Sequence, residues 1–164
     1  MNDTKFTVTV LGFNQALASA ITGALDVFAF AGISWQRIHN LPTKPQFKVQ
    51  LASHHGQPIL CSNQVVLQPN IAIEEVSHTD VLLIPTIGGD IDEVLESTAP
   101  LLVHIRRLQK MGADIAANCT GTFLLAQSEL LENKVATTHW GYADKFKTMY
   151  PTVNLQPEKM VTED

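Results

Sequence analysis

Runs of apolar residues alternate with amphipathic stretches along this chain, and the alternation predicts its secondary structure. Short β-branched and apolar runs bounded by glycine, proline or polar residues indicate buried strands. Such runs occupy residues 6–11, 47–53, 81–85 and 113–117. Apolar residues at helical spacing occupy residues 16–31, 92–111, 120–131 and 139–149. Pro100 predicts a break in the second of these helices, because proline lacks the amide hydrogen that a helix needs. Strands that alternate with helices predict an α/β fold with a mainly parallel sheet.

Smaller elements are predicted around this frame. Residues 58–61 and 65–67 flank a short polar turn and indicate a hairpin. Residues 135–136 and 153–155 are compatible with minor strands. Residues 160–164 begin as a further strand of a hairpin and the sequence stops there. We therefore expect a fragment of a longer protein, without its last elements.

The composition fits one compact domain spanning residues 1–164. Of the 164 residues, 45% are hydrophobic and 16% are charged, and the formal net charge is −5. This charge disfavours binding of nucleic acid or anionic membranes by the segment itself, since phosphate contacts need clustered Lys and Arg. Arg106, Arg107 and Lys110 fit a solvated helix face. The sequence has no signal-peptide pattern, and no apolar run approaches the roughly 18 residues that span a bilayer, which predicts a cytoplasmic protein without membrane contact.

The cysteines and histidines give little support for a disulfide or a metal site. Cys61 and Cys119 do not form a disulfide framework, and we expect reduced thiols, with Cys61 packed in the hairpin. His54 and His55, together with Cys61 or His39, are the only combination that suggests metal ligands. Adjacent residues of a strand point to opposite faces of the sheet, so we expect no metal and no cofactor.

A cysteine follows the last predicted sheet strand in a pattern with the logic of a nucleophile elbow. Residues 113–117 lead directly into Asn118 and Cys119, and the next helix begins there. A sharp strand-to-helix turn needs small neighbours two residues on either side, and Ala117 and Gly121 supply them. The turn presents Cys119 at a helix N-terminus, where free amide groups favour a thiolate.

Three loops follow predicted strands and are expected to meet at one edge of the sheet. They are residues 12–14, 87–90 and 118–120. In open parallel sheets the binding site lies beyond the carboxyl ends of the strands. Amide groups of Thr120 and of the Gly88-Gly89 turn are candidates for an oxyanion hole at this edge.

The elbow and its surroundings resemble the ThiJ/PfpI superfamily. The matching segments are LDVF at 25–28, LIP at 83–85, AANCTGTFLLA at 116–126, ATTHW at 136–140, AD at 143–144 and YP at 150–151. The chain is similar above all to the amidotransferase-like N-terminal domains of AraC-type transcriptional regulators. This resemblance implies a flavodoxin-like three-layer sandwich and a homodimer. It also implies a C-terminal helix-turn-helix domain, absent from this sequence, through which alone DNA is bound.

The resemblance also shows where enzymatic relatives keep their proton-handling groups. Protease-like members carry a histidine directly after the cysteine, where this chain has Thr120. Many enzymatic members, isonitrile hydratases among them, carry an acid in the first helix, at about the position of Ala20, and Asp26 is too far along the helix to replace it. His139 is the remaining candidate partner of Cys119; it either orients a ligand or the thiol, or caps its helix together with Trp140.

We therefore expect a domain that senses a small nitrogenous or amide-like effector and dimerises. The candidate ligand-binding residues are Asn14, Gly88, Gly89, Asn118, Cys119, Thr120 and His139. An alternative is a cysteine-dependent hydrolase or hydratase in which Cys119 attacks a carbon electrophile with the help of His139. A third possibility is redox sensing through oxidation of Cys119 to a sulfinic acid. The apolar helix at 16–31 is either core or a dimer face.

Overall fold

The computed structural model describes residues 5–164 and confirms an α/β fold built on a parallel sheet. Five parallel strands lie in the order β5-β2-β1-β6-β7. Their bounds are β1 (Phe6–Gly12), β2 (Phe47–Ser53), β5 (Ile71–Ala72), β6 (Val81–Ile84) and β7 (Asp114–Ala117). Central β1 pairs with β2 on one side and with β6 on the other, so that Val8 lies between Val49 and Val81. The last five residues of β1 are buried, which explains its β-branched and apolar sequence.

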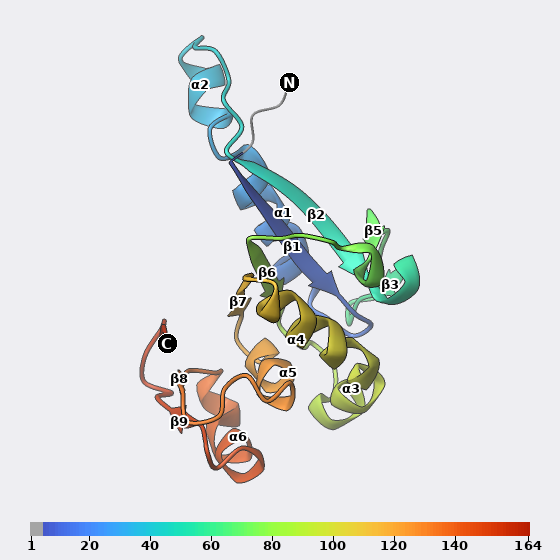
Figure 1. Cartoon of the computed structure of the whole chain (residues 1–164), viewed down its shortest axis with the longest axis vertical. Helices are drawn as coiled ribbons and strands as arrows, with labels where there is room; N and C mark the ends of the chain where they lie inside the picture. The colour runs from blue at the N-terminus through green and yellow to red at the C-terminus, as the bar shows by residue number, and fades with distance from the viewer. Residues whose placement is uncertain (1–4) are drawn as a thin grey trace.

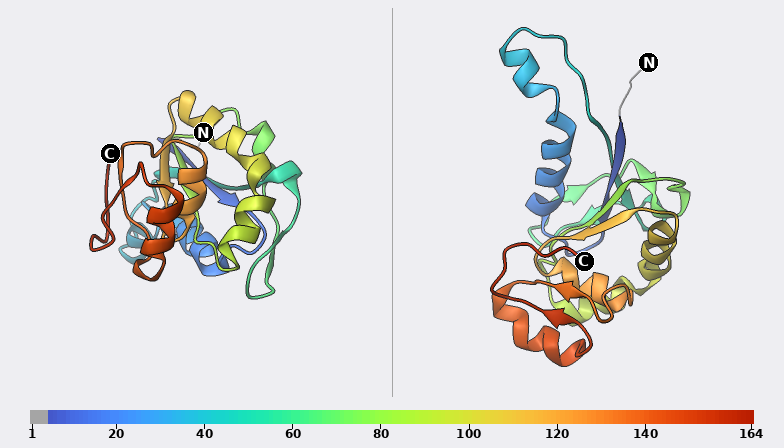
Figure 2. Two further views of the ribbon diagram at one scale, coloured as in Figure 1. Left: turned by 90° about the horizontal axis from the view of Figure 1, so that it is seen from below. Right: turned by 60° about the vertical axis from the view of Figure 1, so that its left-hand side comes forward.

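Helices cover both faces of the sheet. Helix α1 (Ala18–Phe30) follows β1, whereas α3 (Ile91–Ser97), the 3₁₀ turn η3 (Ala99–Leu101) and α4 (Leu102–Lys110) follow β6. Figure 1 and the right-hand view of Figure 2 show α1 and α4 on opposite faces. The chain steps in opposite directions from β1 to β2 and from β6 to β7, and right-handed crossovers then place their helices on opposite faces. The predicted break near Pro100 is confirmed.

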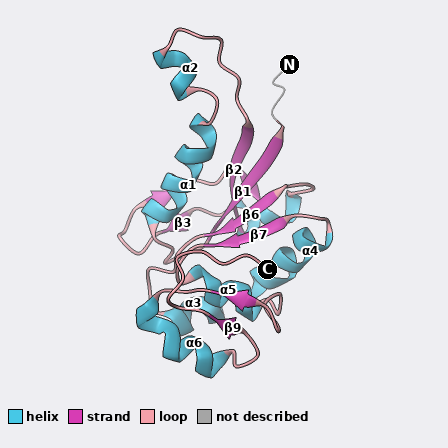
Figure 3. Cartoon of the chain, turned by 90° about the vertical axis from the view of Figure 1, so that its left-hand side faces the viewer, coloured by secondary structure: helices cyan, strands magenta, loops and turns pink. Residues whose placement is uncertain are grey.

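The last third of the chain packs at the carboxyl ends of the strands (Figure 3). It contains α5 (Gly121–Gln127), β8 (Val135–Ala136), the 3₁₀ turn η4 (Trp140–Tyr142), α6 (Ala143–Met149) and β9 (Asn154–Leu155). Helix α5 is apolar on all sides and correspondingly buried. Phe123 has no exposed surface, and its ring lies 4.9 Å from that of Phe146 and 6.2 Å from that of Tyr150. This aromatic cluster fixes α6 against the elbow helix.

Several predicted elements are confirmed and others need correction. The hairpin forms from β3 (Ile59–Leu60) and β4 (Val66–Leu67). Residues 160–164 form no strand, and β9 pairs in parallel with β8 rather than in a terminal hairpin. Helix α1 is not a core helix, since only Ala18 and Ile21 are buried. A short helix α2 (Ser34–Ile38), absent from the prediction, stands beyond the amino ends of β1 and β2 in Figure 1.

No helix within residues 5–164 combines the length and the apolar character that crossing a membrane requires.

Candidate functional site

The chain turns sharply between β7 and α5, as the elbow prediction requires. The Asn118 amide donates to the Ile84 carbonyl at 2.9 Å and ends the strand. Cys119 then adopts φ 54°, a left-handed conformation that is strained for any residue with a side chain and costs on the order of 1–3 kcal/mol. A Cβ at Gly121 would lie 2.5 Å from the Pro85 carbonyl oxygen, so only glycine fits there. Gly121, two residues after the cysteine, therefore has the structural role inferred from the sequence.

The three predicted loops do converge at the carboxyl edge of the sheet. Ala16 pairs with Ile87 in an isolated antiparallel bridge, which joins the first loop to the second. The Thr86 hydroxyl donates to the Asn118 side-chain oxygen, and the Thr120 hydroxyl donates to the Ile87 carbonyl at 2.9 Å. These contacts join the second loop to the elbow. The three loops therefore meet in one hydrogen-bonded network at the sheet edge, as the strand topology predicts.

Cys119 is held through its backbone while its thiol lacks a partner. Its carbonyl accepts from the Thr122 hydroxyl at 2.9 Å and from the Thr138 hydroxyl at 3.1 Å. The thiol is partly exposed and makes no hydrogen bond to any atom of residues 5–164. Cys61 differs, because it is fully buried and burial raises the pKa of its thiol. Accessible sulfur is therefore found at the elbow and not in the hairpin.

Gly88 and Gly89 do not supply the predicted oxyanion hole. Both amides donate to the Gln15 carbonyl, at 2.8 Å and 3.1 Å. A donor already paired with a backbone carbonyl cannot stabilise a developing oxyanion without breaking that bond. At the elbow, the amides of Cys119 and Thr120 donate to no acceptor within residues 5–164, whereas those of Asn118 and Gly121 do. The two glycines instead give the loop its close approach to Gln15 and Ser62, the nearest neighbours of their missing Cβ atoms.

His139 caps a helical turn through its Nδ1 atom. It is the N-cap of η4, and its Nδ1 accepts from the Gly141 amide at 3.1 Å. Its ring stacks on Trp140 with 5.3 Å between centroids, and it is exposed. Nδ1 would have to leave the Gly141 amide before it could take a proton from the thiol. Thr138 lies beside the elbow, yet no hydrogen bond joins the Cys119 thiol to His139 in the described part of the chain.

Ala20 stands where the resemblance implies an acid in enzymatic relatives, and it brings no carboxylate to the first helix. It lies in the first turn of α1, whose start is tied to the elbow region because the Leu17 amide donates to the Thr86 carbonyl at 2.9 Å. A methyl group at Ala20 can neither accept nor deliver a proton. The elbow therefore combines a strained, accessible cysteine with no proton-handling side chain in hydrogen-bonding contact with it.

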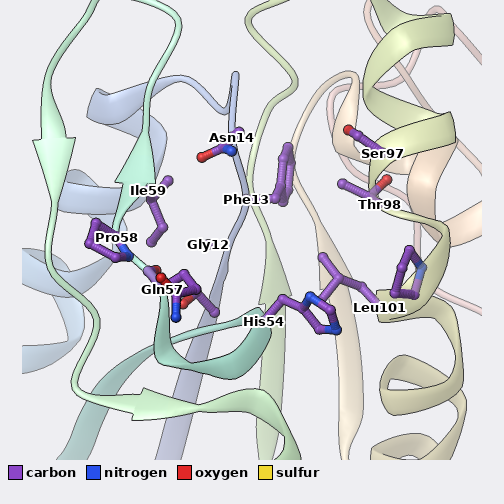
Figure 4. A pocket seen from close by; sticks show the side chains of 12 residues that line it. Gly12, Phe13, Asn14, His54, Gln57, Pro58, Ile59, Ser97, Thr98 and Leu101 are labelled. Carbon is purple, nitrogen blue, oxygen red and sulfur yellow. The ribbon is translucent and has the colours of Figure 1, made fainter.

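A cavity of about 250 Å³ opens beside the elbow network rather than over Cys119. It lies between the ends of β1 and β2, the hairpin and the end of α3 (Figure 4). Apolar side chains on its wall include Phe13, Ile59 and Leu101, and Asn14 and Gln57 bring amide groups to it. Of the predicted ligand-binding residues only Asn14 lines this cavity. Its Oδ1 accepts from the Leu60 amide at 2.9 Å, which leaves its NH₂ group as a donor.

The argument that separated His54 from His55 is wrong. The two residues do not lie on a strand but in the 3₁₀ turn η1 (His54–Gly56), where His55 has φ 51°. Because His55 is left-handed, the side chains of His54 and His55 point to the same side instead of to opposite sides. Their rings stack with 3.9 Å between centroids. Both rings face Glu74 in the 3₁₀ turn η2 (Ile73–Glu75), as does His104 from α4. This cluster had no sequence signal beyond the paired histidines.

Electrostatics and a half-buried arginine hold this cluster. Burial acts to raise the pKa of Glu74, but the amides of Glu74 and His55 and the positive charges of His55 and His104 bring it below its ordinary value. Burial lowers the pKa of His104. Arg107, predicted to lie on a solvated face, instead donates to the carbonyls of Ile73 at 2.9 Å and Val76 at 2.8 Å. Its guanidinium thereby clamps both ends of the turn that carries Glu74.

Comparison with known proteins identifies the family. The DJ-1/PfpI family model matches residues 9–163. The chain belongs to the DJ-1/PfpI family. It is 30% identical over 113 residues to the HTH-type transcriptional regulator CdhR of Pseudomonas aeruginosa, a match that covers 68% of this chain and 32% of CdhR. It is 28% identical over 147 residues to the isonitrile hydratase of Pseudomonas putida, covering 90% of this chain and 56% of that enzyme.

The fold agrees with that membership. The crystal structure of Drosophila melanogaster DJ-1beta superposes with a TM-score of 0.76 at 21% identity, covering 98% of this chain and 78% of that chain. The flavodoxin-like arrangement expected from the sequence is therefore confirmed. The chain spans about a third of CdhR and just over half of the isonitrile hydratase.

Proposed function

We propose that this DJ-1/PfpI chain is the effector-sensing and dimerisation domain of an AraC-type transcriptional regulator. The observation that carries the proposal is the elbow. Cys119 keeps the strained geometry of a nucleophile, while Thr120, Ala20 and the capping His139 leave it without a proton-handling partner. Nucleophilic catalysis needs an activated thiol together with a base or an acid. The similarity to an HTH-type regulator supports the same conclusion.

The cavity beside the elbow is the proposed effector site. Its volume of about 250 Å³ suits a small metabolite, and apolar walls with a few polar groups are typical of ligand pockets. The free NH₂ group of Asn14 and the amide of Gln57 can pair with an amide or another small nitrogenous group. We place the effector there, at the ends of β1 and β2, where it would make no bond to Cys119.

The exposed apolar arm of α1 and α2 is the proposed dimer face. Val27 is 72% exposed and Phe30 49% on α1, and Trp35 is 66% exposed and Ile38 74% on α2. Exposed apolar residues gathered on one arm are typical of a protein–protein contact. The net charge of −5 does not favour DNA binding by this domain, so DNA would be bound by a helix-turn-helix domain that follows it in the parent protein.

Turnover assays on purified protein test the sensing proposal. The wild type and Cys119→Ala are incubated with an isonitrile, a primary amide, a peptide and an α-ketoaldehyde, and product formation is followed. We expect no product above the Cys119→Ala background, together with a thermal shift from a small amide or amine that is lost in Asn14→Ala. Turnover that disappears in Cys119→Ala would overturn the proposal. The sequence of the gene after Asp164 tests the DNA-binding part, where a helix-turn-helix segment is expected.

An isonitrile hydratase-like enzyme is the second candidate. Two observations favour it: the similarity to the Pseudomonas putida enzyme over 90% of this chain, and the left-handed Cys119 with two unpaired amides beside it. In that reaction Cys119 would attack the isonitrile carbon, and a water molecule would have to carry the protons. The isonitrile assay above separates the two candidates.

A further inference from the structure

Three histidines surround one carboxylate oxygen of Glu74. His55 Nδ1 lies 3.4 Å from Glu74 Oε1, His54 Nε2 lies 3.6 Å from it, and His104 Nε2 lies 3.7 Å from it. The ligand atoms of His54, His55 and Glu74 all lie within 4.8 Å of one another. These residues come from two 3₁₀ turns next to the cavity and play no part in the elbow.

The same atoms lack the hydrogen bonds that buried polar groups normally make. Glu74 Oε1 is buried and has no hydrogen-bond partner among the described residues, and neither has His104 Nδ1. Glu74 Oε2, in contrast, accepts from the His55 amide at 3.1 Å. A buried carboxylate oxygen without a donor is costly, since an unsatisfied polar group loses the free energy of its hydration. Glu74 Oε1 is therefore available to a hydrogen-bond donor or to a cation that the three histidines help to surround.

The spacing of the cluster fits a small divalent cation. A tetrahedral zinc ion with bonds of about 2.0–2.1 Å holds its ligand atoms roughly 3.3–3.4 Å apart. The two oxygen–nitrogen separations of 3.4 and 3.6 Å already approach this value. Imidazole nitrogen and carboxylate oxygen are ligands that zinc binds well, and carboxylate hydrogen-bonded to a backbone amide is the kind of outer support that metal sites use.

The fold fixes these ligands before any ion arrives. The left-handed His55 places both imidazoles on one side of η1. Arg107 donates hydrogen bonds to the carbonyls of Ile73 and Val76, on either side of Glu74. These bonds hold the turn so that the Glu74 carboxylate faces the two imidazoles. A site whose ligands are already oriented loses less conformational entropy when the ion binds.

We propose that His54, His55 and Glu74 bind a zinc ion, with His104 supporting the carboxylate from α4. Three protein ligands leave a fourth position for water or for a ligand donor atom. His54 lines the cavity, so that position lies close to space that a small molecule can enter (Figure 4). The zinc site stands independently of the effector-sensing proposal and of the chemistry of Cys119.

Zinc titration of the purified chain tests the site. Any affinity tag is cleaved and metal is removed with EDTA. Every protein, including the reference called wild type in this experiment, carries Cys119→Ser so that the accessible thiol cannot bind the ion. Zinc affinity is measured by competition with a fluorescent chelator, and cobalt replaces zinc in a second measurement, because four-coordinate cobalt absorbs strongly in the visible range. The wild type is expected to bind one ion per chain and to show that absorption.

Matched variants decide the outcome. His54→Ala, His55→Ala and Glu74→Gln should each weaken zinc binding by about tenfold or more and abolish the cobalt bands. His78→Ala is the control, since His78 resembles His55 in having 66% of its side chain exposed and a carboxylate oxygen 3.4 Å away, on Asp80. It should leave the affinity unchanged. Circular dichroism of each variant in EDTA verifies folding. Absence of binding by the wild type, or equal losses in His78→Ala and the cluster variants, would overturn the proposal.

Discussion

A methyl group added at Gly121 tests whether the elbow has the tight packing described above. In Gly121→Ala the new Cβ would lie 2.5 Å from the Pro85 carbonyl oxygen and 2.8 Å from that of Ile84, where ordinary contacts are 3.4–4 Å. Both oxygens belong to the backbone at the end of β6, so no side-chain rotation relieves the contact. The helix α5 or the strand end has to move by roughly 1 Å in a closely packed core.

The expected cost follows from the effects of overpacking. Forcing a methyl group into a filled site costs about 1–3 kcal/mol, and we expect the upper part of that range because backbone atoms form the obstacle. For a chain of this length, each kcal/mol lowers the melting temperature by about 3 °C. Urea denaturation of Gly121→Ala should therefore show a reduced free energy of unfolding with an unchanged slope.

Gly23→Ala is the matched control. Gly23 also lies within a helix, but nothing stands within 4 Å of the position that its Cβ would occupy. Alanine there should stabilise the protein by about 0.5–1 kcal/mol, because glycine is a poor helix former. We therefore predict that the free energy of unfolding falls in Gly121→Ala and rises in Gly23→Ala. If Gly121→Ala were as stable as Gly23→Ala, the strand-to-helix turn could not have the packing described here, and the strained geometry of Cys119 would lose its basis.

Four further predictions concern thiol reactivity, stability at alkaline pH, the arm of α1 and α2, and the Glu74 turn. Iodoacetamide should modify Cys119 well before Cys61, as mass spectrometry would show, and equal rates would contradict the burial of Cys61. Burial raises the pKa of Cys61, and burial together with the Asp92 charge raises the pKa of Tyr150. The contribution of these two groups to the free energy of unfolding should be constant at neutral pH and should fall as the pH rises past their ordinary values of 9.0 and 10.0. Urea denaturation at a series of pH values measures it. Val27→Asp should shift sedimentation from dimer to monomer without changing the circular dichroism spectrum; an unchanged dimer would exclude this arm as the interface. Arg107→Ala should destabilise the fold by about 1.5–3 kcal/mol per charged hydrogen bond lost, measured by urea denaturation, whereas a loss near zero would contradict the clamp.

The main strands and helices could be predicted from the sequence because their burial leaves a periodic pattern. The run at 81–85 is apolar since β6 is covered on both faces, and Pro100 ends α3 for a covalent reason. The failures come from elements whose partners are distant in sequence. Strand β5 has two residues and exists through its pairing with β2, and α1 has the composition of a core helix although most of it is exposed.

The meeting of three loops at the sheet edge was predicted, whereas their individual hydrogen bonds were not. Topology alone brings the ends of β1, β6 and β7 together, which is why the three loops were found. Which donors remain free depends on individual hydrogen bonds, such as those from the two glycine amides to Gln15, and no sequence pattern reports them. The histidine cluster depends on one positive φ at His55, a conformation that non-glycine residues adopt rarely and that the sequence does not announce.

The hydrogen bonds at the sheet edge explain why the cavity does not lie where the strand order reverses. In open parallel sheets ligands bind where the strand order reverses, which here is between β1 and β6. That crevice is occupied by the chain itself, because Ala16 bridges to Ile87 and the Gln15 carbonyl accepts both glycine amides. The open space is displaced toward β2, where Asn14 and His54 line the wall. A ligand seated there would touch the loop that fills the crevice, and through Gln15 it could influence the segment that leads to α1. This connection links the proposed effector site to the proposed dimer face without requiring any chemistry at the thiol.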